Sequence, residues 1–151
     1  MQEEIWKNVV GYEGLYEVSS LGKIKSLDKS VTYINGLTKR ENTQFIPSRI
    51  MKPFVDKDGY LKLQLTKNKK AHKFFIHRLV ALAFLEKALK KTEVNHINGV
   101  KDDNRLENLE WVTSSENQIH AIANNLYKTA RGEKIGSSKL KESEVREIHH
   151  L

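Results

Sequence analysis

The sequence has no cysteine among its 151 residues. Disulfide bonds and thiolate zinc sites are therefore excluded, so neither a small secreted disulfide scaffold nor a cysteine zinc finger is available. The sequence also lacks an apolar run near the roughly 20 residues that a membrane span requires. The start, with Glu3 and Glu4, is acidic where a secretory signal would be basic. We expect a cytoplasmic protein with no membrane partner.

Length and composition favour small folded modules. A chain of 151 residues suits one ordinary domain or two or three modules. Hydrophobic residues make up 38% of the chain and charged residues 30%, which is polar for a globular protein but too apolar for wholesale disorder. We expect a folded protein with a modest core.

Positive charge is in excess, with 26 Lys and Arg against 19 Asp and Glu and a formal net charge of +7. Such a balance attracts polyanions, although a generic solvated basic surface gives the same number. Clustering favours the first interpretation. Six lysines fall within one short stretch and form a predicted phosphate-contacting surface: Lys57, Lys62, Lys67, Lys69, Lys70 and Lys73.

Residues 12–65 have the pattern of short antiparallel strands, because apolar residues alternate and glycines fall between the runs. Two dipeptides, Asn35-Gly36 and Asp58-Gly59, predict tight hairpin turns. After the second, Leu61, Leu63 and Leu65 alternate with polar residues and share one face of a strand. The polar region 39–48 is predicted to be a loop.

The pattern changes to helical over residues 77–85, where apolar residues recur at helical spacing without Gly or Pro. A strand-like run from Val94 ends at a turn with Asn98-Gly99, and a second strand, Leu109 to Thr113, is expected to pair back on it. Trp111 is expected in the core. Ser114 or Ser115 is predicted to cap a further helix that begins near Glu116.

One set of polar residues falls on these elements in an order that could serve a single cation. Asn95 and His96 lie on the first strand, Asn108 in the loop, and Asn117 and His120 on the helix. Oxygen ligands suit Mg²⁺, and an adjacent imidazole can deprotonate a water that attacks phosphorus. An isolated Asn-His pair is more often turn chemistry, and His120 could equally be a surface histidine. His77 could cap or support its helix, or contact a phosphate.

The runs Val94-Asn95-His96-Ile97-Asn98-Gly99, 108–113 and Glu116-Asn117 resemble the HNH endonuclease motif, and the match extends upstream to residues 77–81. Residues 5–7, 11–19 and 22–27 resemble the module that precedes the nuclease in phage and intron homing endonucleases. The resemblance covers most of residues 3–122.

The resemblance implies roles for single residues. It makes His96 the general base and Asn108 the residue that braces the hairpin loop and orients the histidine. Asn95 and Asn117 become metal ligands, and His120 could complete the site. Many relatives have Asp where this chain has Asn95, and an amide oxygen is a weaker ligand than a carboxylate. The implied cofactor is a divalent ion, Mg²⁺ first and Mn²⁺ second.

The expected fold class is α+β, with three parts. Residues 1–56 form an N-terminal β-rich DNA-binding module, residues 57–128 a ββα-metal HNH module, and residues 129–151 a linker and the first helix of a helix-turn-helix-like tail. Residues 140–151 carry the amphipathic pattern of that helix. The second helix of such a motif reads the bases, so the tail is expected to contribute little to cutting.

The leading function is a monomeric, metal-dependent endonuclease of the phage or mobile-element type that cuts double-stranded DNA. The lysines named above, with His77 and Arg78, are the predicted DNA contacts. The alternative is a DNA-binding protein that keeps the scaffold and does not cleave, suggested by the neutral Asn95. An RNA-binding module is the weaker third interpretation, because exposed aromatic stacking platforms are not evident among the strands.

Overall fold

The computed structural model describes residues 3–124 and 126. Those up to Asn117 form one compact unit, and the described residues from Gln118 onward belong to a second unit. The predicted linker and tail helix, residues 129–151, lie outside the described residues. No helix in residues 3–124 combines the length and apolar character needed to cross a bilayer.

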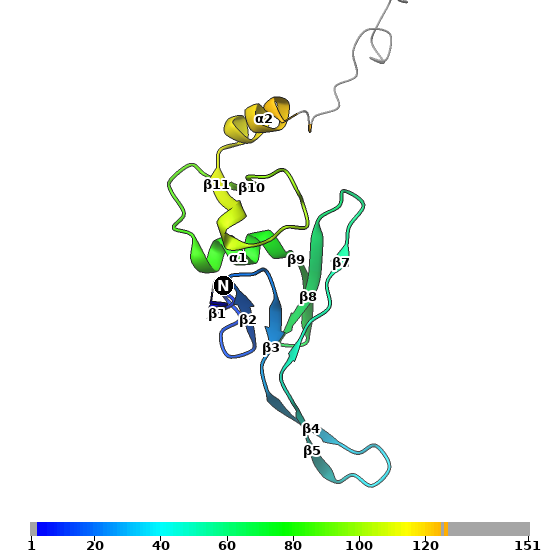
Figure 1. Cartoon of the computed structure of the whole chain (residues 1–151). Coiled ribbons are helices and arrows are strands. Elements are labelled where there is room, and N and C mark those ends of the chain that lie inside the picture. Colours follow the sequence, from blue (N-terminus) through cyan, green and yellow to red (C-terminus); the bar gives the residue numbers. More distant parts are fainter. Residues whose placement is uncertain (1–2, 125, 127–151) are drawn as a thin grey trace, which may run out of the picture. The chain divides into compact units, whose positions relative to one another are not determined.

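The first unit is built from small sheets and a short helix, which confirms the α+β fold class (Figure 1). Every strand pair is antiparallel. The strands are β1 Trp6–Asn8, β2 Tyr16–Ser19, β3 Ile24–Ser26, β4 Lys29–Ile34, β5 Glu41–Ile46, β6 Arg49–Ile50, β7 Phe54–Val55, β8 Leu61–Lys67, β9 Lys70–Phe75, β10 Glu93–His96 and β11 Leu109–Val112. The helical segments are α1 Ile76–Phe84, the 3₁₀ turn η1 Leu106–Asn108 and α2 Ser114–Ala123, which continues into the second unit.

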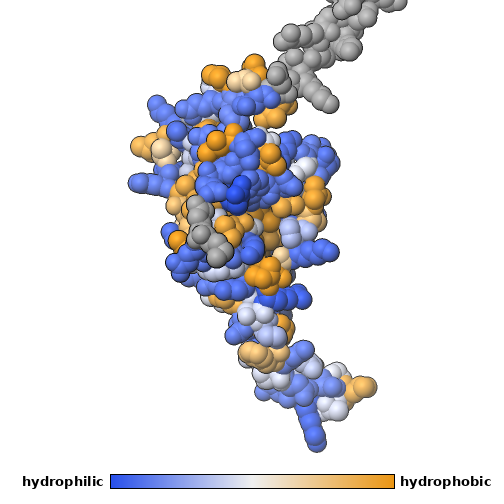
Figure 2. All heavy atoms as spheres, viewed as in Figure 1, coloured by the Kyte–Doolittle hydropathy of each residue, from blue (hydrophilic) through white to orange (hydrophobic). Residues whose placement is uncertain are grey.

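The strands of the described residues form four sheets. β1, β2, β3 and β6 make one sheet in that order, and β7, β8 and β9 make a second. β4 with β5 and β10 with β11 are two separate hairpins. In the first unit the β4–β5 hairpin projects away from the other sheets (Figure 1). Its side chains are mostly exposed, and hydrophobic residues lie among hydrophilic ones on its surface (Figure 2).

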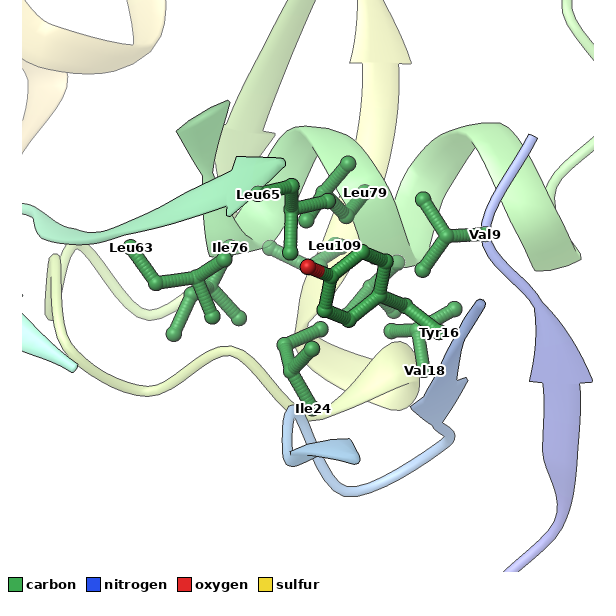
Figure 3. Packing of buried hydrophobic residues seen from close by; sticks show 10 residues of the cluster. Val9, Tyr16, Val18, Ile24, Leu63, Leu65, Ile76, Leu79 and Leu109 are labelled. Atoms are coloured by element: carbon green, nitrogen blue, oxygen red, sulfur yellow. The ribbon is translucent and has the colours of Figure 1, made fainter. Parts of the chain in front are cut away.

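One hydrophobic core joins the N-terminal sheet to the elements that follow it. Figure 3 shows Tyr16 and Ile24 of the first sheet beside Leu65 of β8 and Leu79 of α1. The buried members are Val9, Tyr16, Val18, Ile24, Leu63, Leu65, Ile76, Leu79, Val80 and Leu109. The predicted modules 1–56 and 57–128 therefore share a core, and burial of side chains of this kind contributes about 1.5–3 kcal/mol each.

Several local predictions are confirmed. Leu63 and Leu65 are buried while Gln64 between them is exposed, which is the expected alternation. Gly59 has a φ of 89° in the turn before β8, as the Asp58-Gly59 pair predicts. The helix predicted for residues 77–85 is α1, which begins one residue earlier and ends at Phe84. Trp111 is buried.

Other local predictions are wrong. The predicted loop 39–48 contains β5, whose residues are exposed except for partly buried Ile46. Because neither face of the strand is buried, the sequence shows no alternation of apolar and polar residues there. The predicted tight turn at Asn35-Gly36 is a longer connection, in which the backbone N–H of Asn35 donates to the carbonyl of Arg40 over 2.8 Å. Asn35 Oδ1 accepts two backbone N–H groups within this connection. The positive φ falls on Lys39 instead.

The cap of α2 also differs from the prediction. Thr113 Oγ1 accepts the backbone N–H of Glu116 over 3.2 Å, and Glu116 Oε2 accepts the backbone N–H of Thr113 over 2.7 Å. This reciprocal pair is a capping box. Ser114 and Ser115, the predicted caps, are the first two helical residues.

Candidate functional site

The β10–β11 hairpin carries the central residues of the site. Its register sets Asn95 opposite Glu110 and His96 opposite Leu109. Because side chains alternate along a strand, Glu93 and Asn95 share one face of the hairpin with Glu110, and His96 belongs to the other face. Asn95 is 7% exposed and His96 5% exposed, so the strand presents both within a largely buried setting.

Asn108 fastens the loop between the two strands. Its Oδ1 accepts the backbone N–H of Asn98 over 2.9 Å, and its Nδ2 donates to Asn98 Oδ1 over 2.9 Å and to the Asp103 carbonyl over 2.8 Å. The carbonyl of Asn108 accepts the backbone N–H of Ile97 over 2.9 Å. These bonds fix the chain directly after His96, which is the position where the resemblance places a bracing residue.

His96 lies in a cluster of rings. Its ring centroid is 5.0 Å from that of His77 and 5.9 Å from that of Tyr60. Its Nε2 lies 3.2 Å from Asn104 Oδ1. Burial lowers the pKa of His96, against the raising effect of the bond to Asn104. A neutral imidazole is the form that can accept a proton.

His77 is a buried partner in this cluster. It is 6% exposed, and its ring packs 5.3 Å from Tyr60 and 5.2 Å from Phe75. Burial, followed by the neighbouring His96, lowers the pKa of His77 to about 3. The residue that precedes α1 is Phe75, which caps the helix without a side-chain bond, so His77 does not act as its cap. These contacts favour a supporting role in the ring cluster over a phosphate contact.

The two predicted amide ligands each bond a glutamate. Asn95 Nδ2 donates to Glu110 Oε1 over 2.9 Å, and Asn117 Nδ2 donates to Glu93 Oε2 over 2.6 Å. Both amides therefore direct their nitrogens to a carboxylate and keep their oxygens as acceptors. Within the described residues no three His, Asp or Glu side chains form a metal-binding group. The set of amide and carboxylate oxygens nevertheless fits a hard divalent cation.

His120 lies in the described part of the second unit. It is partly buried near the end of α2, and its carbonyl accepts two hydrogen bonds from Asn124, one from the backbone N–H over 3.1 Å and one from Nδ2 over 2.9 Å. Its place as a third ligand stays a prediction.

The predicted basic surface is divided between the two faces of the β8–β9 hairpin, because Lys62 and Lys73 lie on the face opposite to Lys67 and Lys70. Lys69 and Lys70 are exposed at its turn, where Asn68 and Lys69 have φ values of 52° and 61°. Other lysines have partners: Lys62 Nζ lies 2.9 Å from Asp56 Oδ2, and Lys67 Nζ donates to the Gly11 carbonyl over 2.6 Å. Lys73 lies over the Phe54 ring, 5.8 Å from its centroid, and Lys57 is exposed.

Arg78 is exposed on α1, and its Nη2 donates to the Thr92 carbonyl over 3.1 Å. This bond ties the helix to the residue before β10. The predicted DNA contact by Arg78 therefore competes with a structural bond.

Sequence reasoning did not identify four residues that the structure brings to the site: Tyr60, Glu93, Asn104 and Glu110. Glu93 and Glu110 could have been found from strand pairing, because Glu93 is two residues from Asn95 and Glu110 lies opposite it. Tyr60 and Asn104 depend on contacts between separate segments. Local spacing carries no signal for those contacts.

Comparisons with known proteins identify the family of the chain. Residues 4–66 match the family model described as the NUMOD4 motif, and residues 74–119 match the model described as HNH endonuclease. Over 137 residues the chain is 34% identical to the DNA endonuclease I-HmuI of Bacillus phage SP01, covering 89% of this chain and 68% of that protein. Over 130 residues it is 42% identical to an HNH endonuclease of Acanthamoeba polyphaga mimivirus, covering 83% of this chain.

The chain spans 28% of the mimivirus relative's length. Among solved structures it resembles one described as DNA binding and cleavage by the HNH homing endonuclease I-HmuI. The TM-score is 0.63 at 28% identity, and the match covers 97% of this chain and 67% of the other. The two matched family segments contain the N-terminal sheet and the hairpin site, respectively.

Proposed function

The chain belongs to the HNH homing endonuclease family, and we propose that it hydrolyses phosphodiester bonds in double-stranded DNA with His96 as the general base. The observation that carries the proposal is the hairpin itself. Asn95 and His96 follow one another on β10, and the side chain of Asn108 hydrogen-bonds the loop that comes after them. Asn117 of α2 donates a hydrogen bond to Glu93 on the same strand.

The proposed ligands are Asn95 and Asn117, through their amide oxygens. HNH endonucleases as a family generally use a divalent metal, and Mg²⁺ prefers oxygen ligands and keeps waters that a phosphate can replace. His120 is the candidate third ligand. Bound there, such an ion would stabilise negative charge on the phosphate and on the leaving oxygen.

His96 supplies the proton acceptor. Burial lowers the pKa of His96 and so favours the neutral imidazole. The neutral ring takes a proton from the attacking water, a role that typically contributes about 10²–10⁴-fold to a rate. Asn108 serves this step indirectly, because its bonds to Asn98 and Asp103 hold the chain that follows the histidine.

The DNA would be held by the basic β8–β9 hairpin. Lys69 and Lys70 at its exposed turn carry no acidic partner among the described residues, and phosphate contacts of this kind release counterions. Lys67 shares a face of the hairpin with Lys70, whereas Lys62 and Lys73 lie on the opposite face and Lys57 precedes β8. Of these, Lys62 is already paired with Asp56 and is the weaker candidate.

A second candidate is a DNA-binding protein that does not cleave. The neutral Asn95, whose nitrogen is bonded to Glu110, is the observation that favours it. Both candidates predict DNA binding, so only catalysis separates them.

The deciding experiment is incubation of the protein with supercoiled plasmid in Mg²⁺, in Mn²⁺ and in excess chelator. The proposal expects nicked or linear product in at least one metal and none in chelator. Binding without product in either metal supports the second candidate. Undiminished cutting in chelator contradicts the proposed metal dependence.

A further inference from the structure

Asn104 is the only side chain that hydrogen-bonds the ring of His96 in residues 3–124. It lies in the loop between β10 and β11 and is 3% exposed. The orientation of the Asn104 side-chain amide is fixed by its nitrogen, because Nδ2 donates a hydrogen bond to the Asp102 carbonyl over 3.1 Å. The backbone N–H of Asn104 donates to the same carbonyl over 3.1 Å. The amide of Asn104 is therefore held in one orientation.

This orientation determines which ring nitrogen of His96 carries the proton. With Nδ2 used as a donor, the atom that faces the ring is Oδ1, which can only accept. Nε2 of a neutral His96 must then be the donor, and the proton sits on Nε2. The ring's lone pair is left on Nδ1, which makes no hydrogen bond to the rest of the described chain.

A turn of the N-terminal sheet packs against Asn104. Gly22, in the turn between β2 and β3, lies so close that an added Cβ would fall 2.9 Å from Asn104 Cβ and 2.9 Å from its carbonyl oxygen. The φ of Gly22 is +80°, a region that side chains other than glycine rarely adopt. Only glycine allows this approach.

The turn that carries Gly22 is itself anchored. The backbone N–H of Gly22 donates to the carbonyl of Ser19 over 3.0 Å, and Ser19 is fully buried. On the other side, the N–H of Leu106 donates to the carbonyl of Ser20 over 2.8 Å. The N-terminal turn and the segment after Asn104 are thus hydrogen-bonded to each other.

From these contacts we infer that Asn104 is a positioning residue that fixes the His96 ring as the Nε2–H tautomer, and that the Gly22 turn of the N-terminal module holds Asn104 in place. The first module then supports the base of the second, in addition to any contact it makes with DNA. The inference rests on the proposed role of His96. In the reaction, Nδ1 takes the proton from the attacking water while Nε2 keeps its own.

The tautomer can be measured without substrate or metal. Nitrogen-15 NMR of the histidine rings, under mildly alkaline conditions where imidazole is neutral, distinguishes a protonated from a bare ring nitrogen. The His96 signals are assigned by their loss in His96→Ala. We expect the parent to show a protonated Nε2 and a bare Nδ1. A proton on Nδ1 in the parent overturns the inference.

Two substitutions of Asn104 separate positioning from packing. Asn104→Leu keeps the volume and removes the acceptor, and should give a mixture of the two tautomers. Asn104→Asp keeps an acceptor oxygen, and should retain Nε2–H. A pure Nε2–H ring in folded Asn104→Leu contradicts the inference, because the proton would then not depend on the amide.

The contribution of the N-terminal turn has a matched control. Gly14 has a φ of +73° and nothing within 4 Å of an added Cβ, whereas the Cβ at Gly22 meets Asn104. Both alanine variants carry the backbone strain, and only Gly22→Ala should disturb the His96 tautomer. Equal spectra for the two variants contradict the supporting role of the turn.

Cleavage kinetics then connect the tautomer to the reaction. Loss of an orienting partner typically costs about 10- to 100-fold in activity, so kcat should fall by that factor in Asn104→Leu with little change in KM, and Asn104→Asp should recover part of it. Full kcat in Asn104→Leu contradicts a positioning role. If the parent does not cut DNA at all, the proposed function fails, while the NMR result still decides whether Asn104 sets the tautomer.

Discussion

Asn98 and Asn108 are joined by a reciprocal pair of hydrogen bonds, each 2.9 Å long. Asn108 Oδ1 accepts the backbone N–H of Asn98, and Asn108 Nδ2 donates to Asn98 Oδ1. The pair closes the loop two residues after His96. The position of the proposed base therefore depends on a buried asparagine in the loop that follows it.

Replacing Asn108 with alanine should weaken both the fold and the reaction. The change removes three side-chain hydrogen bonds, to Asn98 and to the Asp103 carbonyl. We expect the free energy of unfolding to fall by about 1–3 kcal/mol, measured by urea denaturation. Asn42→Ala is the control, since the side chain of Asn42 is exposed and donates to the nearby Arg40 carbonyl. Equal effects of the two variants would contradict the bracing role.

His77 should make the protein sensitive to acid. Its pKa lies near 6.5 in the unfolded chain and falls to about 3 in the folded one, mainly through burial. Between these values the unfolded state binds the extra proton, so the free energy of unfolding should fall as pH drops from about 6.5 to about 3. His77→Phe should flatten this slope in melting temperatures measured across that range. An unchanged slope would show that His77 is protonated when folded.

Asn95→Asp should couple stability to the metal. In the parent, Glu110 accepts a hydrogen bond from the Asn95 amide, and the substitution replaces that amide with a second carboxylate. Two adjacent carboxylates repel without a cation and bind one more tightly than a neutral amide does. We expect a lower melting temperature than the parent in chelator and a larger increase on adding Mg²⁺. A response to Mg²⁺ no larger than the parent's would count against Asn95 as a ligand.

The counterpart variant is Asn117→Ala, which removes the other proposed ligand. It should raise the metal concentration that half-maximal cleavage requires, and added Mn²⁺ should restore part of the activity. A metal dependence identical to that of the parent would exclude Asn117 from the ligand set.

DNA binding should depend on salt through the β8–β9 turn. Each phosphate contact contributes about 0.9 to the slope of log affinity against log salt concentration. Replacing exposed Lys69 and Lys70 with glutamine should reduce the slope by roughly twice that amount. Lys62→Gln should have a smaller effect, because Lys62 is paired with Asp56 and stacks 4.0 Å above Phe75. Equal slopes for all variants and the parent would place the phosphate contacts elsewhere.

The parts of the fold that the sequence predicts are those where burial imposes a pattern. Leu63 and Leu65 alternate because one face of β8 is buried, and α1 shows helical spacing because one face packs on the core. β5 could not be predicted, since nearly all of its side chains are exposed and its hydrogen bonds are made by the backbone to β4.

The site follows the same division. The elements that carry Asn95, His96, Asn108 and Asn117 can be predicted, because the hairpin and the helix are local structures. The contact of Gly22 with Asn104 cannot, because it joins segments 82 positions apart in the printed sequence and depends on the shared core. Long-range packing, and not residue spacing, sets the surroundings of the base.

The most direct test of the account is the comparison of His96→Ala and His96→Gln with the parent in plasmid cleavage and in DNA binding. Circular dichroism checks that the variants are folded. If His96 is the base, the cleavage rate should fall by about 10²–10⁴-fold, while the Kd for DNA stays near that of the parent because the basic hairpin is intact. Folded variants that cut plasmid as fast as the parent would contradict the assignment of His96.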